Sequence, residues 1–320
     1  MKNVDRTKTK SIRSAYGKTL VELGKTNKDI VVLDADLACS TQTAMFGKEF
    51  PERFFNMGIA EQDMMATAAG LASQGKIAFA STFAMFATGR TYDQIRNSIC
   101  YSQFNVKVVA THGGITVGED GASHQALEDV ALMRNLPHMT VIVPADCKEC
   151  EEVIKYAAAN KGPMYIRIAR TNVPDIFDEN YKFDLKAKIL REGKDVTIVT
   201  NGETLAEVIE CANILEKSGI DAQIIHMPVV KPLDNGTILE EAKKTNFVVT
   251  VENHSIIGGL GSAVCEAICE NSSENMRTRV YRIGINDEFG QSGEQRQLME
   301  YYGLTAEKLA QKIEEKLKNK

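Results

Sequence analysis

The run Val106-Lys-Val-Val-Ala-Thr111 is followed at once by His112-Gly-Gly-Ile-Thr-Val-Gly-Glu-Asp-Gly-Ala-Ser-His124. The first part is short and β-branched, which is typical of a buried parallel strand. The second part combines four glycines and two histidines with an adjacent glutamate and aspartate. Ligands of open α/β sheets bind beyond the carboxyl ends of the strands. This strand and its loop therefore predict both the fold class and the place of the chemistry.

Similar apolar runs recur along the chain and alternate with stretches of helical period. Ile12, Tyr16, Leu20 and Leu23 form one helical stripe. Further helices are expected at residues 146–159, 204–217 and 304–317, and further strands at residues 30–33, 76–80, 140–143, 164–168, 196–200, 222–226, 247–251 and 278–283. This alternation predicts an α/β protein with parallel sheets.

The rhythm breaks between residues 173 and 194, a segment that contains Pro174 and has no sustained period. We expect a linker there between two doubly wound α/β domains, residues 1–172 and 195–320.

The composition excludes several classes of protein. The 320 residues include 38 Lys and Arg against 43 Asp and Glu, a net charge of −5, which argues against nucleic-acid and anionic-membrane partners. Hydrophobic residues make up 43% of the chain, so disorder is not expected. No apolar run approaches the roughly 20 residues that span a bilayer, and the first residues have no apolar core of a secretory signal. Seven scattered cysteines fit reduced thiols, so we expect a cytoplasmic protein.

Three other polar segments follow predicted strands, at residues 34–40, 81–86 and 169–170. A fourth candidate, Glu61, precedes an apolar helical stretch that begins with Met64 and Met65. A carboxylate in that position can simply complement the helix dipole. Facing an apolar cavity, it could instead share a proton with a ligand nitrogen. The residues alone leave both interpretations open.

Two rival sites are weaker. His112 and His124 are twelve residues apart and have no cysteine beside them, which does not favour a metal site. A solvated, flexible loop is the other alternative for this segment. Gly258-Gly-Leu-Gly261 has Val264 where a dinucleotide fingerprint requires glycine or alanine, so these glycines are expected to allow close packing of a helix on a strand.

Considered together, the loops resemble those of a known family. The pyrimidine-binding half of transketolases is similar to Met57-Gly-Ile-Ala-Glu-Gln62, Thr82-Phe-Ala-Met-Phe86, residues 112–125, Arg134-Asn-Leu-Pro137, Val143-Pro-Ala-Asp146 and Ala169-Arg170. Val251-Glu-Asn-His-Ser-Ile-Ile-Gly-Gly-Leu-Gly261 resembles the C-terminal domain of the same family. The resemblance covers nearly the whole chain, and its motifs agree in order and spacing.

The resemblance implies thiamine diphosphate as the cofactor. It assigns Glu61 to the glutamate that hydrogen-bonds the ring nitrogen of the aminopyrimidine, and Phe83 and Phe86 to the aromatic residues that stack on that ring. It places His124 near the amine of the cofactor. The residues that line the middle of the cofactor would be Asp36 and Leu37. One departure is Gly89, where many full-length members carry an aromatic residue beside the cofactor ring.

The resemblance also implies a sugar phosphate as substrate. Asp120 matches the carboxylate that holds a substrate hydroxyl, which makes Glu61, His124 and Asp120 the expected catalytic residues. His112, Ser40, Arg13 and Arg170 match the groups that bind the phosphate, a task that suits cationic and hydroxyl donors.

One element of the family is missing. The Gly-Asp-Gly…Asn motif, which holds the diphosphate through Mg²⁺ or Ca²⁺, does not occur in the 320 residues, and no metal ligand is expected in this chain. We therefore expect an N-terminal partner subunit that carries this motif, in an α2β2 heterotetramer. The implied activity is transfer of a two-carbon ketol unit from a ketose phosphate to an aldose phosphate, as in the pentose phosphate pathway.

Other activities of thiamine enzymes remain open at this point. A 2-oxo-acid dehydrogenase E1 β subunit would lack Gly118-Glu-Asp-Gly-Ala-Ser-His124, and a deoxyxylulose-phosphate synthase typically has Asp-Arg in place of His112-Gly113. A dihydroxyacetone synthase would share nearly every motif. A non-catalytic scaffold subunit is the alternative from another class, although Glu61, Asp120 and His124 are all present.

Overall fold

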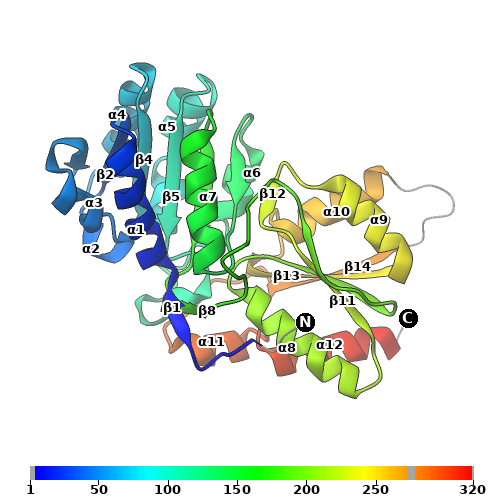
Figure 1. The fold of residues 1–320 in the computed structure, drawn as a ribbon. Helices are drawn as coiled ribbons and strands as arrows, with labels where there is room; N and C mark the ends of the chain where they lie inside the picture. The colour runs from blue at the N-terminus through cyan, green and yellow to red at the C-terminus, as the bar shows by residue number, and fades with distance from the viewer. Residues whose placement is uncertain (1–3, 272–277, 319–320) are drawn as a thin grey trace.

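The computed structural model describes residues 4–271 and 278–318. Two α/β domains lie side by side, and each is built around its own sheet (Figure 1). The expected fold class, two α/β domains with parallel sheets, is confirmed. No helix in the described part of the chain is both long and apolar enough to cross a membrane.

The first sheet has seven strands in the order β12-β6-β7-β5-β4-β2-β3. Its neighbours are parallel, except that β12 pairs antiparallel with β6. The carboxyl ends of β2, β4, β5 and β7 therefore meet at one edge of the sheet. The strands are β2 (Ile30–Asp34), β3 (Phe54–Asn56), β4 (Ile77–Phe83), β5 (Val106–Thr111), β6 (Thr140–Ile142), β7 (Met164–Ile168) and β12 (Val229–Lys231).

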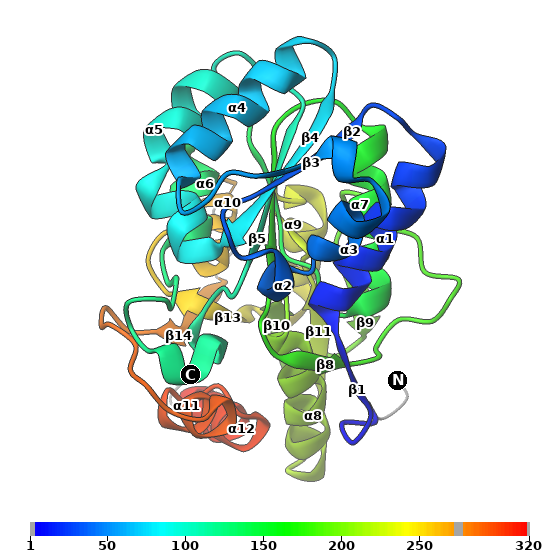
Figure 2. The same cartoon turned by 90° about the vertical axis from the view of Figure 1, so that its left-hand side faces the viewer.

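Helices cover both faces of this sheet, because its strands are apolar on both sides (Figure 2). One face packs against α1 (Ile12–Thr26) and α7 (Cys147–Ala159), and the other against α4 (Glu61–Ser73). Two π-helical turns, η2 (Phe86–Arg90) and η3 (Ile95–Cys100), extend the second layer. The remaining helices of this domain are α2 (Ala38–Thr41), α3 (Ala44–Glu49), α5 (Tyr92–Gln94), α6 (Asp129–Asn135) and the 3-10 helices η1 (Pro51–Arg53) and η4 (Ile115–Asp120).

The second sheet has five strands in the order β14-β13-β10-β11-β9. The strands are β9 (Lys188–Arg191), β10 (Val196–Thr200), β11 (Ala222–His226), β13 (Phe247–Ser255) and β14 (Arg279–Ile285). Helices α8 (Thr204–Lys217), α11 (Gln295–Tyr301) and α12 (Ala306–Lys318) share one apolar cluster on this sheet, and α9 (Asn235–Thr245) and α10 (Leu260–Glu270) share another.

Most predicted elements agree with the structure. The strands expected at residues 106–111, 164–168, 196–200 and 222–226 are confirmed at both ends, as is the helix at 204–217. Strand β4 runs on to Phe83, so Ser81, Thr82 and Phe83 end the strand rather than begin the polar segment expected at residues 81–86. The glycines at 258–261 do allow close packing, because a Cβ on Gly261 would lie 2.6 Å from Thr250 Oγ1 of β13.

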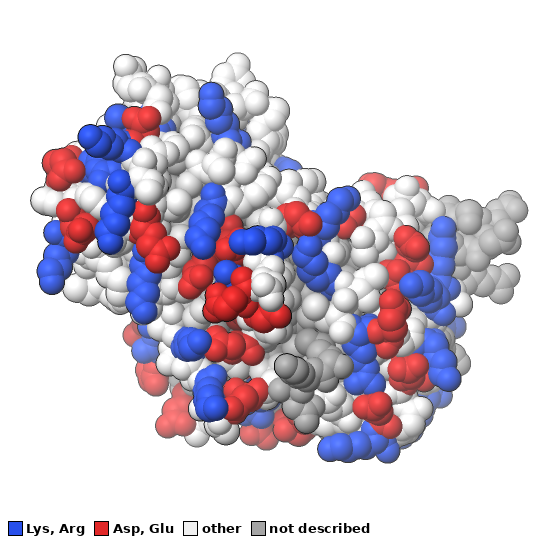
Figure 3. Space-filling view, in the orientation of Figure 1, with Lys and Arg blue, Asp and Glu red and all other residues white. Residues whose placement is uncertain are grey.

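Two features differ from a simple pair of domains joined by a linker. The segment 173–194 is not structureless: it contains β9, and its first residues belong to β8 (Asn172–Pro174), which pairs with β1 (Thr9–Ser11). In addition, β12 leaves the second half of the chain and completes the first sheet. Figure 3 shows the surface hollowed between the two domains, with acidic and basic side chains interspersed on that face.

Candidate functional site

The turn after β2 is organised by a buried carboxylate that we did not single out from the sequence, Asp34. Its oxygens accept hydrogen bonds from the Leu37 amide at 2.6 Å, the Thr41 hydroxyl at 2.7 Å and the Thr43 hydroxyl at 2.8 Å. Burial raises the pKa of Asp34, and the donors oppose this rise. These bonds fix the turn that carries Asp36, Leu37 and Ser40.

Glu61 is the first residue of α4 and is only 4% exposed. Its carboxylate oxygens lie 3.1 and 3.2 Å from Nη1 of Arg90. The same guanidinium lies over the Phe86 ring, 4.2 Å from its centroid. The site thus contains a buried carboxylate beside an aromatic face, and an arginine that touches both.

Phe83, Phe86, His112 and His124 form an aromatic cluster at the ends of β4 and β5. The His112 imidazole stacks on Phe83 with ring centroids 3.8 Å apart, and Phe86 lies 6.1 Å from Phe83 at an angle of 15°. The His124 ring meets Phe86 edge-on at 5.3 Å. The structure therefore brings together side chains that are up to 41 positions apart in the sequence, 124 − 83.

His112 has the most perturbed environment of this cluster. Its backbone is left-handed (φ 61°), its Nδ1 lies 2.8 Å from the Thr111 hydroxyl, and it is 3% exposed. Burial, followed by the positive charges of Arg13 and Arg170, lowers the pKa of His112 to about 3. The imidazole is therefore neutral at physiological pH in the folded chain.

The two arginines provide the cationic side of the site. Arg13 donates from Nη1 to the Ser40 carbonyl at 2.7 Å, while its Nε is buried without a hydrogen-bond partner among the described residues. Arg170 pairs with Glu119 at 2.9 Å and also donates to the Val117 carbonyl. A buried, unpaired guanidinium nitrogen next to a second arginine and a neutral histidine fits an anionic ligand such as a phosphate.

Asp36, Leu37 and Asp120 lie at the rim. Asp36 is exposed and contacts Asn56, and Asp120 is exposed at the end of η4. Within the described residues their side chains make no hydrogen bond to Glu61 or to the aromatic cluster. The structure thus groups Glu61, the aromatic cluster and the arginines more closely than it groups these three.

The long loop after β5 is supported by the second domain. Asn253 on β13 accepts a hydrogen bond from the Ile115 amide at 3.0 Å, and its side chain is so close that Gly114 (φ 74°) has no room for a Cβ. Arg167 on β7 donates to Asp129 at 2.8 Å and to the Asn253 carbonyl at 2.8 Å. The glycines of this loop were a visible signal, but their packing partners Asn253 and Arg167 were not.

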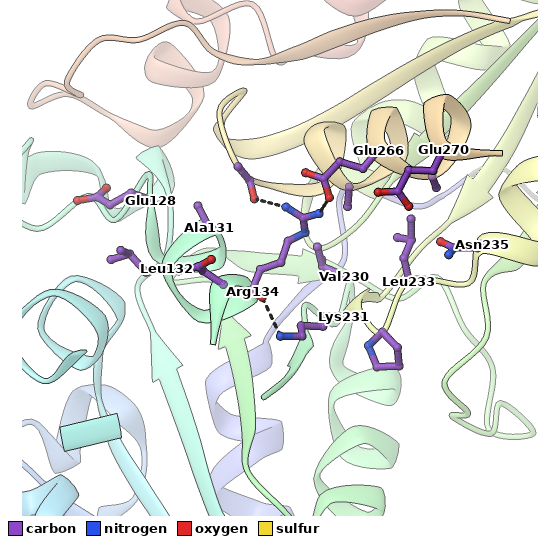
Figure 4. Close-up of a pocket in the computed structure, with 15 residues that line it drawn as sticks. Glu128, Ala131, Leu132, Arg134, Val230, Lys231, Leu233, Asn235, Glu266 and Glu270 are labelled. Carbon is purple, nitrogen blue, oxygen red and sulfur yellow. Dashed lines mark hydrogen bonds and ion pairs between the residues drawn. The ribbon is translucent and has the colours of Figure 1, made fainter. Parts of the chain in front are cut away.

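A cavity of about 780 Å³ lies elsewhere, where α6, β12 and α10 meet (Figure 4). Arg134 points between the two domains, donating to the Gly258 carbonyl at 3.3 Å and pairing with Glu266. Lys231 donates to the Arg134 carbonyl at 2.9 Å. These charged groups hold the domains together, and none of the predicted site residues lines the cavity.

Metal ligation has no support from clustering: no group of three or more His, Cys, Asp or Glu side chains suited to a metal ion occurs in residues 4–271 and 278–318. The groups that are present fit the pyrimidine end of thiamine diphosphate, because a buried carboxylate can bond a ring nitrogen beside a flat aromatic surface.

The chain matches two family descriptions: "Transketolase, pyrimidine binding domain" over residues 8–175 and "Transketolase, C-terminal domain" over residues 185–309. Both domains of the chain therefore match domains of one class of protein, the transketolases. The chain belongs to the transketolase family.

Individual relatives cover almost the same length. A Methanocaldococcus jannaschii protein described as "Putative transketolase C-terminal section" is 52% identical over 97% of each chain. A Clostridium protein described as "6-deoxy-6-sulfo-D-fructose transketolase subunit SqwH" is 41% identical over 95% of this chain and 94% of its own. A solved structure described as "Split gene transketolase, inactive beta4 tetramer" is 51% identical, with a TM-score of 0.88 over 96% of this chain and 98% of its own.

Proposed function

We propose that the chain is the C-terminal subunit of a thiamine-diphosphate-dependent transketolase. With an N-terminal subunit it transfers a two-carbon ketol unit from a ketose phosphate to an aldose phosphate. The observation that carries this proposal is the buried Glu61 carboxylate beside the aromatic cluster, at the edge where β2, β4, β5 and β7 end. A carboxylate that is 4% exposed, and whose partner Arg90 also lies over the Phe86 ring, is suited to hydrogen-bond a ring nitrogen of an aminopyrimidine.

Thiamine diphosphate supplies a nucleophilic carbon that carries the ketol unit between sugars. Glu61 hydrogen-bonds the ring nitrogen of its aminopyrimidine, while Phe83 and Phe86 stack on the ring. His124 would lie near the cofactor amine, and Asp36 and Leu37 would line the middle of the cofactor. His124 is also the proposed partner for exchange of a proton with a substrate oxygen, because an imidazole nitrogen can donate or accept a hydrogen bond.

The substrate phosphate is bound by Arg13, Ser40, His112 and Arg170. The unpaired Nε of Arg13 has a free donor for it, and Arg170 reaches it by leaving Glu119. Asp120, exposed on the same loop, holds a substrate hydroxyl. One relative is named for 6-deoxy-6-sulfo-D-fructose. The sulfonate of that sugar, like a phosphate, is a compact anion. The same donor set suits both tails, so the assay must include both.

The partner subunit supplies the Gly-Asp-Gly…Asn motif and the Mg²⁺ or Ca²⁺ that holds the diphosphate. Three facts support a partner. This motif does not occur in the 320 residues, one relative of similar length is described as a "section", and another is described as a "subunit". We propose an α2β2 assembly. The seven cysteines, scattered through the chain, agree with a cytoplasmic complex acting in carbohydrate metabolism, such as the pentose phosphate pathway.

The test is a reconstitution from separate subunits. The chain, the N-terminal partner and their mixture are assayed with thiamine diphosphate, Mg²⁺, an aldose phosphate acceptor and, in separate reactions, a ketose phosphate or 6-deoxy-6-sulfofructose as donor. We expect turnover only in the mixture. Full turnover by the chain alone would overturn the partner proposal.

Changing the substrates in the same assay separates the related activities. Turnover of a 2-oxo acid would indicate an E1-type enzyme, and condensation of pyruvate with an aldose phosphate would indicate a deoxyxylulose-phosphate synthase. A strong preference for formaldehyde as acceptor would indicate a dihydroxyacetone synthase. A mixture that binds the cofactor but turns over none of these would indicate a scaffold subunit.

A further inference from the structure

Arg90 occupies a specific place in the site that the proposed function does not explain. Its Nη1 lies 3.1 and 3.2 Å from the two Glu61 carboxylate oxygens, and its Cζ lies over the Phe86 ring, 4.2 Å from the centroid. These are the two groups to which the proposed function assigns the pyrimidine ring. One side chain of this subunit thus already uses both contacts.

The guanidinium resembles an aminopyrimidine in the properties that these contacts detect. It is a flat, delocalised group with N–H donors in its plane, and it stacks well on aromatic rings. An aminopyrimidine ring is also flat and presents nitrogen at its edge. A carboxylate at the edge and a phenyl ring on the face therefore satisfy either group, but not both at once.

We propose that Arg90 is a resident surrogate for the aminopyrimidine ring: it fills the ring's place in the cofactor-free subunit and must leave before the cofactor binds. This inference rests on the proposed function of Glu61 and Phe86. Arg90 is therefore a residue that sets cofactor affinity, because a ligand binds more weakly when its site is open for only a fraction of the time.

The exposures of the two partners explain why such a surrogate is useful. The Glu61 side chain is 5% exposed, whereas that of Arg90 is 50% exposed. An unpaired carboxylate at that depth is costly, so Arg90 keeps Glu61 satisfied until a ring nitrogen replaces it. Arg90 itself can move into solvent at little cost.

The backbone around Arg90 favours a movement of the side chain alone. Arg90 ends the π-helical turn η2, four residues after Phe86, which lets its side chain fold back over that ring. π-Helical turns are frequent at functional sites. The Arg90 carbonyl accepts a hydrogen bond from Gln62 Nε2 at 3.0 Å, which ties this backbone to the first turn of α4. The exchange therefore needs no rearrangement of the helices.

The first experiment measures the affinity of thiamine diphosphate with Mg²⁺ for the assembled two-subunit complex by titration calorimetry. We expect Arg90→Ala to bind the cofactor roughly 5- to 10-fold more tightly, because it removes an ion pair and a ring contact that compete with binding. Arg90→Lys keeps a charge but stacks poorly, so its cofactor affinity should lie between those of the unchanged complex and of Arg90→Ala. Arg96→Ala is the matched control, since Arg96 is exposed and bonds only its neighbour Asn97 among the described residues.

The second experiment uses the full chain alone, with 4-amino-2,5-dimethylpyrimidine as the probe in ligand-observed NMR. We expect the probe to bind Arg90→Ala, to bind the unchanged chain at least several-fold more weakly, and to be displaced from Arg90→Ala by millimolar guanidinium chloride. The double variant with Glu61→Gln should lose the probe.

The results separate the two proposals. If Arg90→Ala binds the cofactor as Arg96→Ala does, or more weakly, while Glu61→Gln still impairs binding, the surrogate is wrong and the proposed function stands. If Glu61→Gln leaves cofactor binding unchanged, the proposed function fails and the surrogate fails with it. Tighter binding by Arg90→Ala, together with probe binding that depends on Glu61, supports both.

Discussion

Glu61 can be tested by replacing its carboxylate with an amide of the same size. Glu61→Gln keeps the volume of a side chain that is 5% exposed but removes the charge that the ring nitrogen needs. We expect hydrogen–deuterium exchange at C2 of the bound cofactor to slow by about 100-fold or more in the assembled complex, the usual size of a general acid–base contribution. The exchange is followed by proton NMR after acid quench.

The matched control for this variant is Asp63→Asn, which changes an exposed carboxylate in the same turn of α4. Its exchange rate should equal that of the unchanged protein. An unchanged rate in Glu61→Gln would show that this carboxylate does not activate the cofactor.

His112 makes the stability of the protein depend on pH, because its pKa differs between the folded and the unfolded chain. Its pKa falls from 6.5 to about 3 on folding. Between these two pH values the unfolded chain binds a proton that the folded chain does not. The contribution of His112 to the free energy of unfolding is therefore fully present above pH 6.5 and is lost as the pH falls toward 3. For one group, the free energy of unfolding should drop by about 2 kcal/mol at most from pH 7 to pH 5.

Urea unfolding at the two pH values measures this difference. His112→Gln cannot take up the proton, so its free energy of unfolding should fall by less over the same interval. Equal pH dependence in the two proteins would mean that His112 titrates normally in the folded state.

At the scale of elements, the long buried strands were predictable, whereas the short edge strands were not. β5, β7, β10 and β11 are buried along their whole length, and their short, mainly apolar runs contrast with the polar segments around them, so the local pattern marks their limits. β9 and β12 have only four and three residues and lie at sheet edges. They pair with strands that are distant in the sequence, so the local sequence pattern cannot predict this pairing.

The same distinction applies to the site. The glycines, histidines and phenylalanines of the loops are dense enough to be noticed in the sequence. Arg90 was not noticed, because its contacts depend on a π-helical turn that adds a residue to the helix. Asp34 was read as part of a polar loop, since nothing local indicates that it is buried and accepts three hydrogen bonds.

The buried ion pair between Asp129 and Arg167, beside the long loop, leads to a further prediction. Asp129, the first residue of α6, is buried and pairs at 2.8 Å with Arg167, whose side chain is 4% exposed. Asp129→Asn removes one charge and leaves the other buried without its partner. We expect the free energy of unfolding to fall by about 3–5 kcal/mol, measured by urea denaturation.

Asp184→Asn serves as the control, because the Asp184 side chain in the Asp184–Lys188 pair is 58% exposed. It should cost less than about 1 kcal/mol. If the two variants lost equal stability, the buried pair would contribute no more than a surface pair.

At the scale of the whole molecule, the domains share structure rather than only a linker. β12 belongs by sequence to the second half of the chain and by pairing to the first sheet. The Val143 carbonyl accepts a hydrogen bond from the Gly202 amide at 3.2 Å, and the Val143 amide donates to the Pro228 carbonyl at 2.8 Å. Arg134 and Asn253 add side-chain contacts across the same boundary. The first sheet is therefore not complete without a strand from the second half of the chain.

This sharing predicts that the chain unfolds as one unit, although multidomain proteins often do not. We expect a single calorimetric transition whose calorimetric and van't Hoff enthalpies agree. Asn253→Ala leaves the buried Ile115 amide without its acceptor, and should lower the midpoint of that one transition by about 2–4 °C rather than split it. Asn180→Ala, at an exposed position of the segment 173–194, should leave the midpoint in place. Two resolved transitions, one of them unaffected by Asn253→Ala, would show that the domains fold independently, and that the support of the long loop by β13 adds nothing to the stability of the first domain.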